Sequence, residues 1–225
     1  MQKLVQGLHK FRTEIYPGQK ALYQELANGQ NPDTLFITCS DSRITPNELT
    51  QTEPGDLFIL RNAGNLIPAY NGTQIGGEGA TIEFAITELG VKHVVVCGHT
   101  LCGAMKALLH PEKLSGVPQV AKWLAHAEPT RRLVEENYGH LSETDRTTVM
   151  AEENVLLQIE NLRTHPAVRS KLARGELSLH AWVFKIQTAE IFQFNSETSQ
   201  FELFAGKPKS VERSRPMRRL DAVAI

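Results

Sequence analysis

Short apolar runs alternate with predicted helices in the first half of the chain, and this order constrains the fold more than any other sequence feature. Residues 34–39 (TLFITC) predict a buried strand, and residues 92–97 (KHVVVC) are apolar through their centre, as in a strand covered on both faces. Residues 57–60 predict a strand between them, and residues 80–89 predict a helix that stops at Gly90. We therefore expect an α/β fold around a central, mostly parallel β-sheet flanked by helices, with right-handed crossovers.

A helical arm is predicted at the start of the chain, over residues 1–28. Apolar residues recur there at intervals of three or four, at Leu4, Leu8, Phe11 and Ile15. Pro17 is expected to interrupt this helix, and Gly29 is expected to end the second one. Such an arm packs either on a neighbouring subunit or on the chain's own core, and the pattern leaves both open.

The remaining segments complete the expected order of elements. Thr45 can cap a helix that has Pro46 in its first position, and Glu48 would close a capping box. Residues 117–174 predict several helices, and residues 179–204 predict a C-terminal strand followed by a hairpin.

We expect a single domain over residues 1–225, because the sequence contains neither a linker nor an internal repeat. Its parts would be the arm, an α/β core over residues 30–205, and a basic tail over residues 206–225. The tail is either a solvated segment or a docking segment for an acidic partner.

The composition narrows the classes of partner and location. The chain carries 24 Lys and Arg against 25 Asp and Glu, so its balance of charge favours neither nucleic acid nor a membrane surface as partner. No apolar run is long enough for a signal-peptide core or a membrane span, and we expect a cytoplasmic protein. Three Cys in such a chain suggest thiolate chemistry or metal ligation rather than disulfides.

Two short motifs follow predicted strands and carry the chemistry of the sequence. Cys39 ends the first predicted strand, and Asp41 and Arg43 follow it at intervals of two residues. His99 follows the third predicted strand and precedes Cys102 by three residues. Ligands of parallel sheets collect beyond the carboxyl ends of the strands, so we expect the two motifs to meet there.

Two thiolates and an imidazole are a plausible zinc set. Three protein ligands would leave one coordination position for water, as in catalytic zinc sites. Two thiolates neutralise the charge of the zinc ion. An ion held in this way should therefore acidify its bound water less than an ion held by three neutral His. We therefore expect Asp41, held by Arg43, to accept a hydrogen bond from that water or hydroxide and to orient it.

The motifs Cys-x-Asp-x-Arg at 39–43 and His-x-x-Cys at 99–102 resemble those of the β-class carbonic anhydrases, which interconvert carbon dioxide and bicarbonate. The similarity is greatest to the plant-type branch found in cyanobacteria and other bacteria. It extends from the N-terminal helices to about residue 205, through segments 30–32, 55–58, 61–65, 98–99, 152–155 and 177–182.

The resemblance implies one zinc ion per chain on Cys39, His99 and Cys102, with water or hydroxide as the fourth ligand. It implies that the Asp41–Arg43 dyad lies behind the ion and that zinc-bound hydroxide attacks carbon dioxide.

For substrate binding, the resemblance implies a hydrogen bond from Gln30, an apolar wall at Phe58 and a cleft lined by the Gly64 region. Phe84 stands where many relatives have Tyr, so a pocket hydroxyl is absent. The family also implies homodimers with active sites at the subunit interface, often assembled into larger oligomers.

Three alternatives remain open at this stage. The same zinc site could hydrolyse carbonyl sulfide or carbon disulfide, which are also linear electrophiles. A low-activity interaction protein could retain the zinc fold and use the basic tail as its contact, although the intact dyad speaks against this. The location could be the carboxysome, with carboxysome proteins as partners, although carboxysomal relatives usually carry a longer C-terminal extension.

Overall fold

The computed structural model describes residues 1–72 and 76–206, so the predicted basic tail lies almost wholly outside the described residues. The chain divides into two compact units between Asn31 and Pro32. The prediction of a single domain over residues 1–225 stays a prediction.

The N-terminal unit is helical throughout most of its length. It contains α1 (Gln2–Lys10), a π-helical turn (Phe11–Ile15) and α2 (Tyr16–Leu26). The predicted interruption at Pro17 is wrong, because this proline lies in the first turn of α2, where its ring and missing N–H are tolerated. The arm extends to Leu26, and Gly29 follows with a positive φ of 149°.

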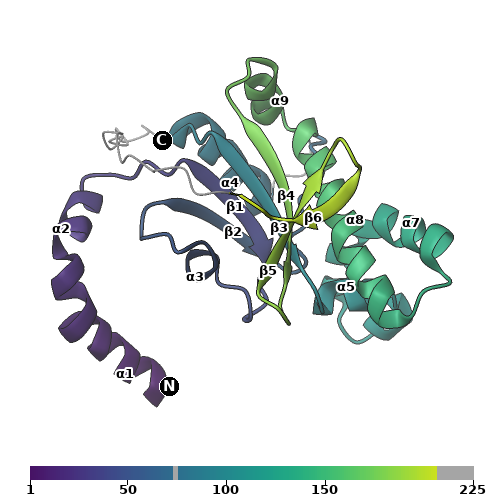
Figure 1. The fold of residues 1–225 in the computed structure, drawn as a ribbon, viewed down its shortest axis with the longest axis horizontal. Coiled ribbons are helices and arrows are strands. Elements are labelled where there is room, and N and C mark those ends of the chain that lie inside the picture. The colour runs from purple at the N-terminus through teal and green to yellow at the C-terminus, as the bar shows by residue number, and fades with distance from the viewer. Residues whose placement is uncertain (73–75, 207–225) are drawn as a thin grey trace. The chain divides into compact units, whose positions relative to one another are not determined.

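The second unit is built on one six-stranded sheet in the order β2-β1-β3-β4-β5-β6 (Figure 1). The strands are β1 (Thr34–Cys39), β2 (Leu57–Asn62), β3 (His93–His99), β4 (Ser178–Lys185), β5 (Glu190–Asn195) and β6 (Gln200–Leu203). The first four strands in this order are mutually parallel, whereas β5 and β6 are antiparallel additions. The expected α/β class with a C-terminal strand and hairpin is therefore confirmed.

Helices connect the parallel strands and extend the unit on one side. They are α3 (Pro46–Thr50), α4 (Gly77–Phe84) with a π-helical turn (Ala85–Leu89), α5 (Gly103–Leu108), α6 (Pro118–Leu124), α7 (Glu128–Tyr138), α8 (Glu143–Thr164) and α9 (Pro166–Ala173). Short 3₁₀ turns lie at Pro111–Leu114 and Ala125–Ala127. Among the described residues, no helix combines the length and the apolar character needed to cross a membrane. The predicted capping box is wrong in one respect: Thr45 is the N-cap of α3, but its side chain makes no capping hydrogen bond.

Alternate residues of β1 face two different layers of the core. Leu35 and Ile37 join a cluster with side chains of α4, α8 and α9, whereas Phe36 packs with Ile44 on the opposite face. The sheet is therefore covered on both faces at its centre, which explains the apolar runs at residues 35–37 of β1 and 94–97 of β3. The long helix α8 lies across β3 and β4 (Figure 1).

Helix α8 packs tightly against the sheet at Gly98, the penultimate residue of β3. A Cβ at this position would lie 2.8 Å from Val155 Cγ2 and 3.3 Å from the carbonyl oxygen of Ala151. Only glycine lets the helix lie this close to the strand end, and that end carries His99.

We expect Gly98→Ala to lower the free energy of unfolding by about 1–3 kcal/mol, because overpacking forces α8 away from β3. Urea denaturation at one protein concentration measures this loss. Gly116→Ala is the matched control, since nothing lies within 4 Å of a Cβ there. An equal effect of the two substitutions would contradict the role given to Gly98.

Candidate metal centre

Three buried side chains converge at the carboxyl end of the parallel strands. Cys39 is the last residue of β1, His99 is the last residue of β3, and Cys102 is the residue before α5. Their ligand atoms all lie within 4.8 Å of one another, and the two sulfur atoms are 3.9 Å apart. Leu101, with a φ of +56°, turns the backbone between the last two. Within the described residues, this is the only group of three or more such side chains that could hold a metal ion.

The imidazole of His99 is oriented as a metal ligand would be. Its Nδ1 lies 2.9 Å from the carbonyl oxygen of Thr100, which can only accept, so Nδ1 carries the proton. Its Nε2 is therefore a lone-pair acceptor, and it is buried with no hydrogen-bond partner among the described residues. A buried polar atom without a partner is costly, and a cation bound at Nε2 would remove that cost. The residues present therefore fit a metal ion.

The two thiols also fit a cation. The hydrogen bond from Cys102 lowers the pKa of Cys39, with help from the backbone N–H of Gly64, although burial opposes the change. The pKa of Cys102 is raised, because Cys39 lies beside it and because it is buried. One thiolate thus forms readily, whereas a second needs a nearby positive charge. The third thiol, Cys97, is a buried core residue of β3, where burial raises its pKa to about 12.

Asp41 and Arg43 form the bidentate pair that their spacing predicts. Arg43 Nε donates to Asp41 Oδ1 at 2.9 Å and Nη2 donates to Oδ2 at 2.7 Å, while the backbone N–H of Arg43 donates to Oδ1 at 3.0 Å. These bonds hold the pKa of Asp41 well below its usual range. Asp41 Oδ2 also lies 3.8 Å from His99 Nε2, so an ionised carboxylate faces the cluster.

Arg61 of β2 holds the backbone that carries the first ligand and the dyad. Its Nε donates to the carbonyl oxygen of Cys39 at 3.0 Å, and its Nη2 donates to that of Asp41 at 2.7 Å. Sequence reasoning did not single out these contacts. The available signals were its position just after a predicted strand and its place in segment 61–65 of the family resemblance, and neither indicates these partners.

The residues predicted to bind substrate are only partly brought to the cluster. Gly64 is at the cluster, since its N–H donates to Cys39 Sγ at 3.4 Å. Phe58 and Phe84 contact each other with ring centroids 5.9 Å apart, but Phe58 pairs with Leu35, four residues before Cys39 on β1. At about 3.3 Å per residue, Phe58 lies roughly 13 Å from the strand end. Gln30 belongs to the N-terminal unit, and its role stays a prediction.

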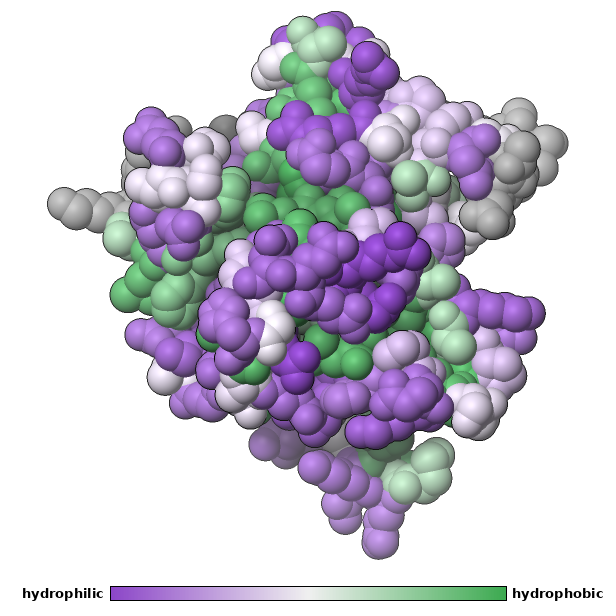
Figure 2. All heavy atoms as spheres, turned by 90° about the vertical axis from the view of Figure 1, so that its right-hand side faces the viewer, coloured by the Kyte–Doolittle hydropathy of each residue, from purple (hydrophilic) through white to green (hydrophobic). Residues whose placement is uncertain are grey.

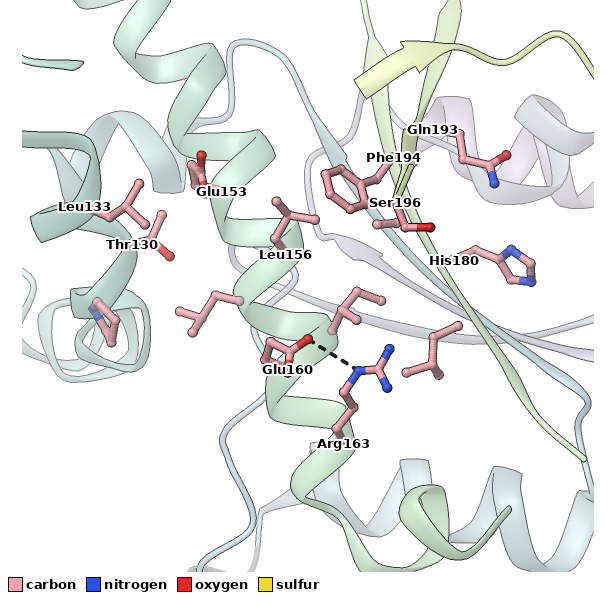
Figure 3. Close-up of a pocket in the computed structure, with 15 residues that line it drawn as sticks. Thr130, Leu133, Glu153, Leu156, Glu160, Arg163, His180, Gln193, Phe194 and Ser196 are labelled. Atoms are coloured by element: carbon pink, nitrogen blue, oxygen red, sulfur yellow. Dashed lines mark ion pairs between the residues drawn. The ribbon is translucent and has the colours of Figure 1, made fainter. Parts of the chain in front are cut away.

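The larger of two cavities described in the molecule is not at this cluster. It has a volume of about 630 Å³ and lies between α7, α8 and the strands β4 and β5, where apolar surface lies in a hollow beside hydrophilic side chains (Figures 2 and 3). Leu133, Leu156 and Phe194 line it, and Glu160 and Arg163 form an ion pair at 3.4 Å on its wall. None of its lining residues is a thiol, so the predicted chemistry lies elsewhere in the molecule.

Known proteins resemble the chain over most of its length. The family model described as carbonic anhydrase matches residues 34–191. A carbonic anhydrase of Synechococcus elongatus is 50% identical over 200 residues, which cover 88% of this chain and 73% of that protein. The solved structure of the β-carbonic anhydrase CcaA has a TM-score of 0.88 and 48% identity, covering 90% of this chain and 98% of that chain. One of two tetrameric β-carbonic anhydrases from Sordaria macrospora has a TM-score of 0.78 and 29% identity, covering 86% and 96%.

Removing the guanidinium should change how stability depends on pH. A lowered pKa of Asp41 stabilises the folded state above the ordinary aspartate pKa, and this contribution is lost as the pH falls. When the pH rises from about 3.5 to about 6, we expect the free energy of unfolding to increase less for Arg43→Gln than for the unmodified chain. The change should be modest, because the Arg43 side chain is 45% exposed and solvent screens the pair.

Urea denaturation of the metal-free protein at both pH values measures this difference. Arg163→Gln, which removes a more exposed ion pair, is the control. A gain in Arg43→Gln as large as in the unmodified chain would contradict the assigned cause.

Proposed function

Because the chain belongs to the β-class carbonic anhydrase family, we propose that it catalyses the reversible hydration of carbon dioxide with one zinc ion on Cys39, His99 and Cys102. The observation that carries this assignment is the buried, unpartnered Nε2 of His99 beside two thiols. A zinc ion bound there would polarise a water molecule and make it a nucleophile at neutral pH.

In this proposal Asp41 and Arg43 are the residues that orient the nucleophile. Asp41 stays ionised because Arg43 binds both of its oxygens, so at neutral pH it acts as an acceptor of hydrogen bonds. Because this acceptor is fixed near His99 Nε2, it sets the direction in which the attacking water donates its proton. The oxygen lone pair of that water then points away from the carboxylate of Asp41. Arg43 also donates to the carbonyl oxygen of Leu101 at 3.0 Å, which ties the dyad to the turn between two ligands.

We also propose that a second copy of the chain completes the substrate pocket. Phe58 and Phe84 lie too far along β2 and α4 from the strand end to line the cluster of their own chain, as the register of β1 and β2 indicates. In a homodimer or larger oligomer they would form the apolar wall for carbon dioxide beside the Gly64 loop, with Gln30 as hydrogen-bond donor. The cytoplasmic location, with the carboxysome and its proteins as the alternative, stays a prediction.

Stopped-flow hydration of carbon dioxide across about pH 6–9, on protein of measured zinc content, tests the proposed activity. We expect about one zinc ion per chain and a rate that rises with pH. A full zinc complement with negligible turnover would contradict the proposal, and assays with carbonyl sulfide and carbon disulfide would follow.

Substitution of a ligand should remove zinc and activity together. We expect this of His99→Ala and Cys39→Ala, whereas Cys97→Ala should retain both, because Cys97 is a buried thiol outside the cluster. Asp41→Ala should keep its zinc and lose roughly 10–100-fold in kcat. A His99→Ala protein with full zinc content would refute the ligand assignment, and full activity of Asp41→Ala would refute the role of the dyad.

The oligomeric state is tested by sedimentation velocity over a range of protein concentrations. We expect a dimer or a larger assembly built from dimers. A fully active monomer would exclude a pocket shared between two copies.

A further inference from the structure

We propose that Trp123 is a positioning residue of the metal centre, because it controls, through one peptide group, the hydrogen bond that the Cys39 sulfur accepts from the N–H of Gly64. The inference rests on the proposed function in one respect, which is that Cys39 is a metal ligand. It assigns to α6 a part in the reaction that the motifs of the sequence do not indicate.

Three groups form a continuous chain of hydrogen bonds that ends on the ligand. Trp123 Nε1–H donates to the carbonyl oxygen of Ala63 at 2.8 Å. That carbonyl and the N–H of Gly64 belong to the same peptide group, and this N–H donates to Cys39 Sγ at 3.4 Å. A donor on the carbonyl oxygen polarises the peptide and makes its N–H a stronger donor. The indole therefore acts on the sulfur without touching it.

The peptide is held so that it cannot turn away from the sulfur. Gly64 has a φ of +81°, and a Cβ there would lie 3.1 Å from both Ala104 Cβ and Met105 Cε. Its own carbonyl oxygen accepts a hydrogen bond from Asn154 Nδ2 of α8 at 3.0 Å. Gln158 Nε2 in turn donates to Asn154 Oδ1 at 2.9 Å. The loop is thus fixed from α6 on one side and from α8 on the other.

This series of hydrogen bonds affects the metal centre through the balance of charge between the two thiolates and the ion that they would bind. Two thiolates offset the whole charge of a divalent ion, which weakens its power to acidify water. A hydrogen bond to Cys39 Sγ withdraws electron density from the sulfur, so a metal ion held there would keep more of its positive charge. We infer that Trp123 lowers the pH at which the enzyme becomes active. The ring of His126, which is a titratable group, packs edge-on against the indole with centroids 5.4 Å apart.

Trp123→Phe tests the inference, because it keeps an aromatic ring and removes the N–H. Trp182→Phe is the matched control, since Trp182 Nε1 is buried and has no hydrogen-bond partner among the described residues. In the cobalt(II)-substituted proteins, we expect the thiolate-to-cobalt charge-transfer band to move to lower energy in Trp123→Phe and to stay in place in Trp182→Phe.

The zinc enzymes give a second readout. We expect the midpoint of the pH profile of kcat/KM to rise by roughly half a pH unit in Trp123→Phe. The value of kcat/KM would then fall about threefold on the acid side and stay unchanged on the alkaline plateau. His126→Gln, which keeps the indole, should leave the midpoint unchanged. If Trp123→Phe does not fold, incorporation of 3-benzothienylalanine at position 123 removes the N–H and keeps the shape of the ring.

Lower activity of Trp123→Phe with an unchanged band and midpoint would mean a purely structural role and would overturn the inference. Equal band shifts in the Trp123 and Trp182 variants would overturn it as well. Because the absorption measurement needs no turnover, it distinguishes a failure of this inference from a failure of the proposed function. A cobalt protein without any thiolate band would refute Cys39 and Cys102 as ligands, whereas a band that does not respond to Trp123 would refute only this inference.

Discussion

The parallel pairing of β1 with β3 is the interaction on which the rest of the molecule depends. The two strands pair from Thr34 opposite His93 to Thr38 opposite Cys97, so both end at the same edge of the sheet. Cys39 and His99 are the residues that leave this edge. If β3 slipped by one residue against β1, every side chain of β3 would turn to the other face of the sheet, and His99 would move away from Cys39. The apolar side chains that fix the register therefore also fix the cluster.

Much of this arrangement could be predicted from the sequence, because it follows from local patterns. The strands are marked by apolar runs, and the motif residues adjoin them. The contacts of Arg61 and Trp123 could not be predicted in this way, since the hydrogen bond from Trp123 reaches a carbonyl 60 residues away in sequence. Such contacts depend on how α6 packs against the loop after β2, and no periodicity records that packing.

The two wrong details have local causes. Pro17 was expected to break a helix, but a π-helical turn immediately before α2 places it where no intrahelical N–H is needed. Thr45 was expected to cap α3 with its side chain, yet it provides only the extended backbone of an N-cap. The helical segment therefore continues through Pro17, whereas Thr45 marks the start of α3 correctly but does not cap it with its side chain.

The ligands come from segments that are far apart in the chain, and this has a consequence for how the protein is made. An unfolded or partly synthesised chain offers only His99 and Cys102 as neighbours, and Cys39 joins them when β3 takes its place beside β1. A complete set of donors therefore exists only after the centre of the sheet has assembled. In the proposed metal enzyme, binding of the ion by all three side chains would therefore follow the pairing of β1 with β3.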